Sequence, residues 1–158
     1  MTAPDHSMRR RDRELDEAEA WAILDRGEWG VLATVDADGW PYAVPVNHVL
    51  VDGALIIHCA TEGHKLDNLS TESRVSYCVV TQAEVLPVEL ATRYESAIVF
   101  GRASLVSDEA AKRDALLALG ERFASEHAGT VRAEIEKDLF RTTVIRIEIE
   151  RITGKARK

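Results

Sequence analysis

Residues 31–69 read VLATVDADGWPYAVPVNHVLVDGALIIHCATEGHKLDNL, and this stretch decides the fold. With the preceding Gly30, it contains three strand-like segments: Gly30–Val35, Trp40–Val51 and Ala54–Thr61. Asp-Gly pairs at residues 38–39 and 52–53 separate them, and such pairs tolerate positive φ and favour two-residue hairpins. Connections this short cannot carry a parallel crossover, so the stretch predicts an antiparallel meander.

The third strand ends in the sequence T-E-G-H-K, where a short helix is expected to begin at His64. A helix N-terminus presents free backbone N–H groups and a partial positive charge. Two basic side chains accompany them here. Thr61, His64 and Lys65 are therefore a candidate phosphate cradle, which indicates a nucleotide-type cofactor.

The rest of the chain extends the same antiparallel pattern. Further strands are predicted at Arg74–Thr81, at Tyr94–Val106 with a bulge or bend at Gly101, and over residues 143–150, where apolar residues alternate. Residues 82–92 show no clear period. Four helices are expected. The first begins at Asp16, with a capping box to Glu19, and ends at Gly27. The others begin at His64, Ser107 and Val131.

These elements predict a mostly β protein with peripheral helices, in which six antiparallel strands form a barrel. Residues 1–13 are polar and charged, and we expect them to be a mobile segment. Residues 14–158 are expected to form a single domain, because their length suits one core.

Composition narrows the possible partners. The net charge of −7 disfavours binding to polyanions through bulk charge, so no nucleic-acid partner is expected. No apolar run approaches the roughly 18 residues that span a bilayer, and no apolar segment follows Arg9–Arg11 as it would in a secretory signal. We therefore expect a cytoplasmic protein with no membrane partner.

Two cysteines, Cys59 and Cys78, lie in strand-like apolar segments. Free cysteine is often buried, so both are interpreted as small core residues rather than as a disulfide. The spacing of His48, His58 and His64 with Cys59 matches no common metal site, and no metal is expected.

The second strand carries two prolines four residues apart, Pro41 and Pro45. Both lack the N–H that a neighbouring strand would need on that edge. The pattern indicates either an ordinary edge strand or an edge along which a planar ligand lies, using groups around Val46, Asn47 and His48. The residues alone leave both interpretations open.

Three motifs together resemble the pyridoxamine 5′-phosphate oxidase-like split barrels, and most closely their nitroimidazole-resistance (Nim) flavoproteins. They are L-A-T-V-D-x-D-G-x-P-Y-x-V-P-V at Leu32–Val46, V-D-G-x-L-x-x-H-x-A-x-x-G-x-K at Val51–Lys65, and Y-x-S-x-x-V-x-G at Tyr94–Gly101. A last strand ending in Ile-Thr-Gly-Lys at 152–155 fits as well.

The resemblance implies a six-stranded split barrel and a homodimer that binds FMN at the subunit interface. By position it assigns the phosphate to Thr61, His64 and Lys65, and the flavin ring to the backbone around Val46, Asn47 and His48. It implies that Tyr94 and Ser96 approach from the other subunit and that His58 lies near the flavin face. Trp40, Tyr42, Tyr94 and Val99 are the expected interface residues.

The chain also departs from the vitamin B6 oxidases. The cradle has His64-Lys65 where those enzymes have an Arg-Lys pair, and the Arg-rich C-terminal substrate motif is missing. True pyridoxamine phosphate oxidase activity is therefore not expected. The first function hypothesis is an FMN oxidoreductase that reduces nitroaromatic compounds of the 5-nitroimidazole type, with His58 as catalytic proton donor. The alternatives are a flavin-binding or storage protein without catalysis, and a haem- or deazaflavin-handling relative.

Overall fold

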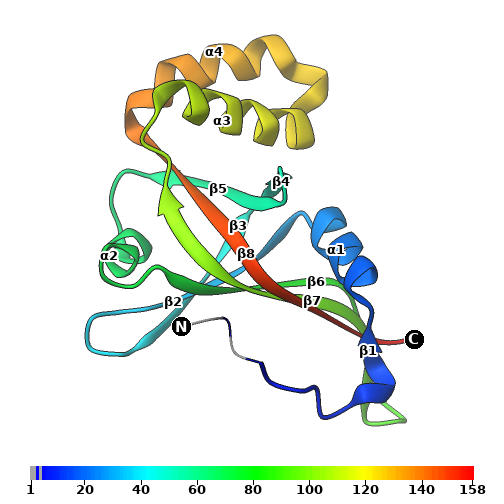
Figure 1. Cartoon of the computed structure of the whole chain (residues 1–158). Coiled ribbons are helices and arrows are strands. Elements are labelled where there is room, and N and C mark those ends of the chain that lie inside the picture. Colours follow the sequence, from blue (N-terminus) through cyan, green and yellow to red (C-terminus); the bar gives the residue numbers. More distant parts are fainter. Residues whose placement is uncertain (1–2, 4) are drawn as a thin grey trace.

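The computed structural model describes residues 3 and 5–158, and its centre is one antiparallel sheet of eight strands, curled into a half-barrel (Figure 1). The strand order is β3-β2-β6-β7-β8-β5-β4, and β1 pairs with β8 outside this path. The strands are β1 Glu14–Leu15, β2 Trp29–Val35, β3 Pro41–Asn47, β4 Val49–Val51, β5 Ala54–Ala60, β6 Arg74–Leu86, β7 Ala91–Leu105 and β8 Thr142–Arg157. The helices are α1 Glu17–Arg26, α2 His64–Thr71, α3 Glu109–Ala124 and α4 Ala128–Asp138, with 3-10 turns at Arg11–Arg13, Ser125–His127 and Leu139–Arg141. This is the split barrel that the sequence predicted.

All six predicted strands are present, but the one expected at Trp40–Val51 is divided at His48. Its first half, β3, ends the strand order on one side, and its second half, β4, ends it on the other. The chain therefore passes from one edge of the curled sheet to the other within a single residue. β3 pairs only with β2 in the described part of the chain, which confirms the edge strand indicated by the two prolines.

The two Asp-Gly turns differ in the structure. Asp52 and Gly53 have φ values of 50° and 75° and form the predicted two-residue turn between β4 and β5. The prediction for Asp38-Gly39 is wrong, because the loop between β2 and β3 covers residues 36–40. The Asp36 carboxylate accepts hydrogen bonds from the N–H groups of Asp38 and Trp40, which stabilises this longer loop.

Residues 82–92, which show no sequence period, form the outer part of a long β6–β7 hairpin. β6 continues to Leu86 and β7 begins at Ala91. Most side chains of this arm, including Val85, are exposed on both faces. No buried face therefore requires apolar and polar residues to alternate there. The register shifts beside Gly101, which confirms the predicted bulge, and a Cβ at Gly101 would lie 2.3 Å from the Glu148 carbonyl oxygen.

The barrel interior holds the main core, which α1 helps to close. The predicted capping box is confirmed, because Asp16 accepts from the Glu19 N–H and Glu19 accepts from the Asp16 N–H. Ile23 and Leu24 pack into the core. The helix ends at Gly27, where a Cβ would lie 2.4 Å from the Val79 Cγ1 atom, so only glycine fits this approach.

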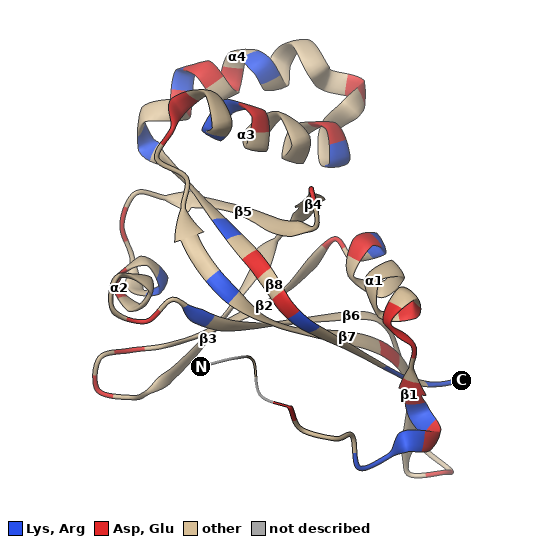
Figure 2. Ribbon diagram, in the orientation of Figure 1, with Lys and Arg blue, Asp and Glu red and all other residues tan. Residues whose placement is uncertain are grey.

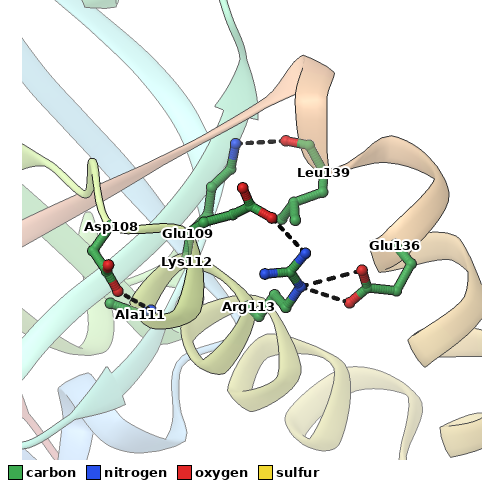
Figure 3. A network of polar contacts seen from close by, with 7 residues as sticks. All are labelled: Asp108, Glu109, Ala111, Lys112, Arg113, Glu136 and Leu139. Carbon is green, nitrogen blue, oxygen red and sulfur yellow. Dashed lines mark hydrogen bonds and ion pairs between the residues drawn. The ribbon is translucent and has the colours of Figure 1, made fainter.

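Helices α3 and α4 form a hairpin between β7 and β8 and cover a second cluster that includes Ile56 and Val144 (Figure 1). Asp108, rather than the expected Ser107, caps α3 by accepting from the Ala111 N–H. Arg113 bridges Glu109 of its own helix and Glu136 of α4 (Figure 3). The Lys112 ammonium donates to the Leu139 carbonyl, which joins the end of α4 to α3.

Several expectations concern the remainder of the chain. Both cysteines are free thiols and half-buried. None of the described helices is long and apolar enough to cross a bilayer. The segment expected to be mobile, residues 1–13, includes residues 1, 2 and 4, which lie outside the described part.

Candidate functional site

The predicted phosphate cradle is an uncapped helix N-terminus. Gly63 precedes α2 with φ 133°, and no side chain caps the helix. The first backbone bonds of α2 run from Leu66 N–H and Asp67 N–H to the Gly63 carbonyl. The N–H groups of His64 and Lys65 have no backbone partner among the described residues, so they are available to an anion.

Two further features suit an anion at this place. A Cβ at Gly63 would meet nothing within 4 Å, so the approach to the helix end is open. Lys65 of α2 lies near Cys59 of β5: burial raises the pKa of the Cys59 thiol, and the charge of Lys65 acts against this rise. No ion pair holds the Lys65 ammonium within the described chain. Thr61, the residue that follows β5, is exposed.

His64 connects the cradle to the edge strand β3. Its imidazole ring lies against the Tyr42 ring, with 4.2 Å between centroids and planes 34° apart. The structure thus brings Thr61, His64 and Lys65 together and places the Pro41–Asn47 strand beside them. Tyr42 was expected at a subunit interface, and its ring contact with His64 was not foreseen.

Helix α2 is fixed to the barrel by a buried amide. The Asn68 Nδ2 atom donates to the Thr34 hydroxyl oxygen of β2 at 2.9 Å, and both side chains are buried. Thr34 in turn lies 3.5 Å from the Tyr42 carbonyl oxygen. This contact fixes the orientation of α2, and therefore of its N-terminal N–H groups, relative to β2 and β3.

At the other end of β3, the predicted flavin-lining residues serve two different purposes. Asn47 is exposed, and its amide donates to the Glu28 carbonyl at 2.9 Å. His48 is buried, with Nε2 2.9 Å from the Leu24 carbonyl oxygen and Nδ1 2.9 Å from the Tyr77 hydroxyl. The same hydroxyl lies 3.0 Å from the Val46 carbonyl oxygen. The His48 side chain therefore points into the core, and only its backbone can line a ligand.

Burial is the main cause of the pKa shifts of His48 and Tyr77. It lowers the pKa of His48, while the hydrogen bond to the Leu24 carbonyl acts in the opposite direction. Burial also raises the pKa of Tyr77. His48 is therefore a neutral, structural histidine at the corner between β3 and β4.

His58 lies on β5 opposite Val144 of β8, with its side chain exposed. Side chains alternate along a strand, so His58 faces away from Cys59, the neighbour of Lys65. Partial burial lowers the His58 pKa, and no described residue hydrogen-bonds its ring. The imidazole is thus unengaged and free to meet a ligand on the outer face of β5.

Tyr94 and Ser96 lie far along the β6–β7 hairpin from α2, in register with Arg157 and Lys155 of β8. Within one chain they do not meet the cradle. They alternate in phase with Ile98, whose side chain is on the outer face of the barrel. That they serve a neighbouring subunit stays a prediction.

The outer face of the barrel carries a mostly apolar row across five strands. Register places in line Pro45 of β3, Val31 of β2, Cys78 of β6, Ile98 of β7 and Thr153 of β8. Paired residues of neighbouring antiparallel strands share a face. We call this row the outer apolar row.

Exposed residues flank the outer apolar row. Trp29 and Val80 are 55% and 48% exposed. The expectation that Val99 lies at an interface is wrong, because it alternates with Ile98, points into the barrel and is fully buried. Trp40, at the loop between β2 and β3, is 73% exposed.

Sequence reasoning missed the residues that hold the site in place, namely Thr34, Asn68 and Tyr77. A polar residue inside an apolar strand, such as Thr34, is a weak signal because threonine is common in strands. Nothing in the sequence pairs Asn68 with it. No group of three or more His, Cys, Asp or Glu side chains in the described chain is arranged to hold a metal ion.

The fold is shared with several solved proteins. A candidate 5-nitroimidazole antibiotic resistance protein from Bacteroides thetaiotaomicron has 21% identity and a TM-score of 0.73, over 90% of this chain and 85% of that one. An FAD and haem binding protein from Mycobacterium smegmatis has 26% identity and a TM-score of 0.79, over 92% and 74%. A haem storage protein from Vibrio cholerae has 20% identity and a TM-score of 0.68, over 88% and 94%.

No curated protein matches the chain in sequence. The family model described as pyridoxamine 5′-phosphate oxidase matches residues 16–156, which include strands β2 to β7, β8 as far as Ala156, the α2 cradle and the α3–α4 hairpin. The solved neighbours include flavin-binding and haem-binding proteins of the same fold. The chain belongs to the pyridoxamine 5′-phosphate oxidase family.

Proposed function

We propose that this protein is an FMN-binding oxidoreductase that reduces nitroaromatic compounds of the 5-nitroimidazole type. The observation that carries the proposal is the α2 cradle: the N–H groups of His64 and Lys65 and the Lys65 ammonium have no partner among the described residues, and the His64 ring contacts Tyr42 of the edge strand β3. Such an end suits a phosphate, and the neighbouring edge strand suits a flat ring system. The open approach at Gly63, where a Cβ would meet nothing within 4 Å, supports a phosphate at this place.

In this proposal His64 and Lys65 hold the phosphate, with Thr61 beside them. The exposed edge of β3 up to Asn47 borders the ring. Bound flavin would supply the electrons for nitro reduction. The protein supplies position through the Asn68–Thr34 contact, and protons through His58.

We propose further that the protein acts as a homodimer that assembles through the outer apolar row. Exposed Trp29, Val80 and Ile98 lie on or beside this row, and contiguous apolar surface marks interfaces. Tyr94 and Ser96 continue the same face toward the hairpin tip, which suits their predicted role in the partner's site. Sedimentation of the flavin-bound protein at micromolar concentration tests this, and a monomer would contradict it.

The function is tested on the purified protein in two steps. The absorption spectrum of the bound cofactor comes first, because a flavin, a deazaflavin and a haem absorb differently. The protein is then reduced without oxygen and mixed with a nitroimidazole. Reoxidation that accompanies nitroimidazole consumption supports the oxidoreductase.

A flavin that stays reduced would instead indicate a flavin-binding or storage protein. A haem spectrum would indicate a haem-handling relative. Two of the solved neighbours bind or store haem, so the spectrum must distinguish haem from a flavin.

A further inference from the structure

The positive charges of the chain are concentrated at its two ends. Residues 9–13 and 155–158 together hold seven of the twenty Lys and Arg residues, in a chain whose net charge is −7. The fold brings these segments side by side, because β1 pairs with the end of β8 in the register Glu14↔Lys155 and Leu15↔Gly154 (Figure 2).

This juxtaposition depends on a close approach that only glycine permits. A Cβ at Gly154 would lie 2.9 Å from the Ala20 Cβ atom and 3.1 Å from the Leu15 Cβ atom. The end of β8 is thus packed tightly against β1 and α1. The two basic segments are therefore held together by the pairing of β1 with β8.

Between them lies a groove of about 530 Å³, which we call the terminal groove. Its basic lining residues are Arg10, Arg13, Arg157 and Lys158, and its acidic ones are Asp12, Glu14 and Glu19.

Two of the acidic groups already have partners. The Asp12 carboxylate accepts hydrogen bonds from Nε and Nη2 of Arg10, which lower the Asp12 pKa to about 2. Glu19 caps α1 and lies 3.8 Å from Lys158.

The remaining cations are less engaged. No described acidic side chain lies within ion-pair distance of Arg13, which is half-buried in the groove. Arg157 forms an ion pair with the exposed Glu89 at 2.6 Å, a contact that contributes little at a surface. Guanidinium groups bind phosphate oxygens through paired N–H donors, so these two residues suit a phosphorylated ligand.

We propose that the terminal groove is a second anion site, separate from the α2 cradle, that binds a small ligand bearing two linked phosphates. Its volume is that of a small-molecule pocket. The acidic remainder of the surface repels an extended polyanion such as nucleic acid, or an anionic membrane. A compact, multiply charged anion is therefore selected.

The probe is inorganic pyrophosphate, titrated calorimetrically into the Lys65→Ala variant so that the α2 cradle does not contribute. ADP is titrated in parallel, to separate recognition of the phosphates from recognition of a nucleoside. The variant under test adds Arg13→Gln and Arg157→Gln. The matched control adds Lys137→Gln and Arg141→Gln, which remove the same charge from exposed ion pairs beside α4.

We expect pyrophosphate affinity to fall at least tenfold in the Arg13/Arg157 variant and less than twofold in the control. Tighter binding of ADP than of pyrophosphate would support a nucleotide ligand. The proposal is overturned if pyrophosphate does not bind, or if both variants lose affinity equally. Preferential binding of a single-stranded oligonucleotide or of anionic vesicles would also overturn it. None of these outcomes depends on FMN binding.

Discussion

The Tyr77 hydroxyl lies 2.9 Å from His48 Nδ1 and 3.0 Å from the Val46 carbonyl oxygen, although it has a single hydrogen to donate. With His48 neutral and its Nε2–H donating to Leu24, both neighbours of the hydroxyl are acceptors. The single hydroxyl proton therefore faces two acceptors at the corner between β3 and β4.

Replacing Tyr77 with phenylalanine removes the hydroxyl donor that lies beside both acceptors. We expect Tyr77→Phe to lower the free energy of unfolding by about 1–3 kcal/mol, because buried polar groups lose their partner. Urea unfolding monitored by circular dichroism measures it. Tyr42→Phe is the matched control and should change stability by less than about 0.5 kcal/mol, since no described residue bonds its hydroxyl. Equal effects in the two variants would contradict the assignment.

Stability should fall on mild acidification. Burial lowers the pKa of His48 in the folded protein, whereas the unfolded chain has a histidine pKa of about 6.5. The unfolded state therefore takes up the proton first. The contribution of His48 is complete above pH ~6.5 and is lost as pH falls through that value toward the folded pKa.

The His48 imidazole can be titrated directly by ¹⁵N NMR. We expect an Nε2-protonated tautomer at neutral pH and a pKa below 6.5. A pKa above 6.5 would show that the cation, which lets Tyr77 donate to Val46, outweighs the cost of burial. Arg122 disfavours that cation and Asp25 favours it.

Lys65 is expected to recognise the phosphate of the cofactor. Lys65→Ala should weaken FMN roughly ten- to a hundredfold, since a charge-assisted hydrogen bond contributes on the order of 1.5–3 kcal/mol. Riboflavin, which lacks the phosphate, should lose much less affinity. Fluorescence titration of both flavins gives the comparison, with Lys137→Ala as a control for charge. Equal weakening of the two flavins would refute the role.

His58 is expected to deliver a proton during nitro reduction. His58→Ala should retain FMN and slow single-turnover oxidation of the reduced flavin by a nitroimidazole by about 10²-fold. His58→Gln separates the roles, because glutamine donates a hydrogen bond but does not titrate. The His58 pKa is lowered by burial, so the wild-type rate should rise as pH falls below about 6.5.

Stopped-flow measurements over this pH range follow the reaction, with His127→Gln as the matched control. Wild-type rates in both His58 variants would make the residue structural. Loss of flavin would place it in the cofactor shell instead.

The sequence predicted the strands well because their signals are local. Alternation along residues 143–150 and the Asp52-Gly53 turn each depend on neighbours in the chain. The division at His48 was missed, because its cause is the burial of one imidazole between Leu24 and Tyr77, which are distant in sequence. The β6–β7 arm was missed because most of its side chains are exposed, so no buried face requires its residues to alternate.

The residues of the candidate site also differ in whether the sequence could predict them. The helix end at Gly63, with His64 and Lys65, was predictable from composition and spacing. The Asn68–Thr34 contact was not, because it joins residues 34 positions apart that carry no joint signal. His58 was placed on the correct strand, but its face relative to Lys65 follows only from the observed register.

The α3–α4 hairpin leaves β7 after Leu105 and returns to β8 at Thr142, and Leu105 and Ile145 are register partners in adjacent strands. The hairpin therefore enters and leaves the sheet at nearly one point. A segment attached in this way can be lengthened, shortened or exchanged without shifting any strand. What such a change must preserve is a cover for Ile56 and Val144, so this is the part of the molecule where grafting should be best tolerated.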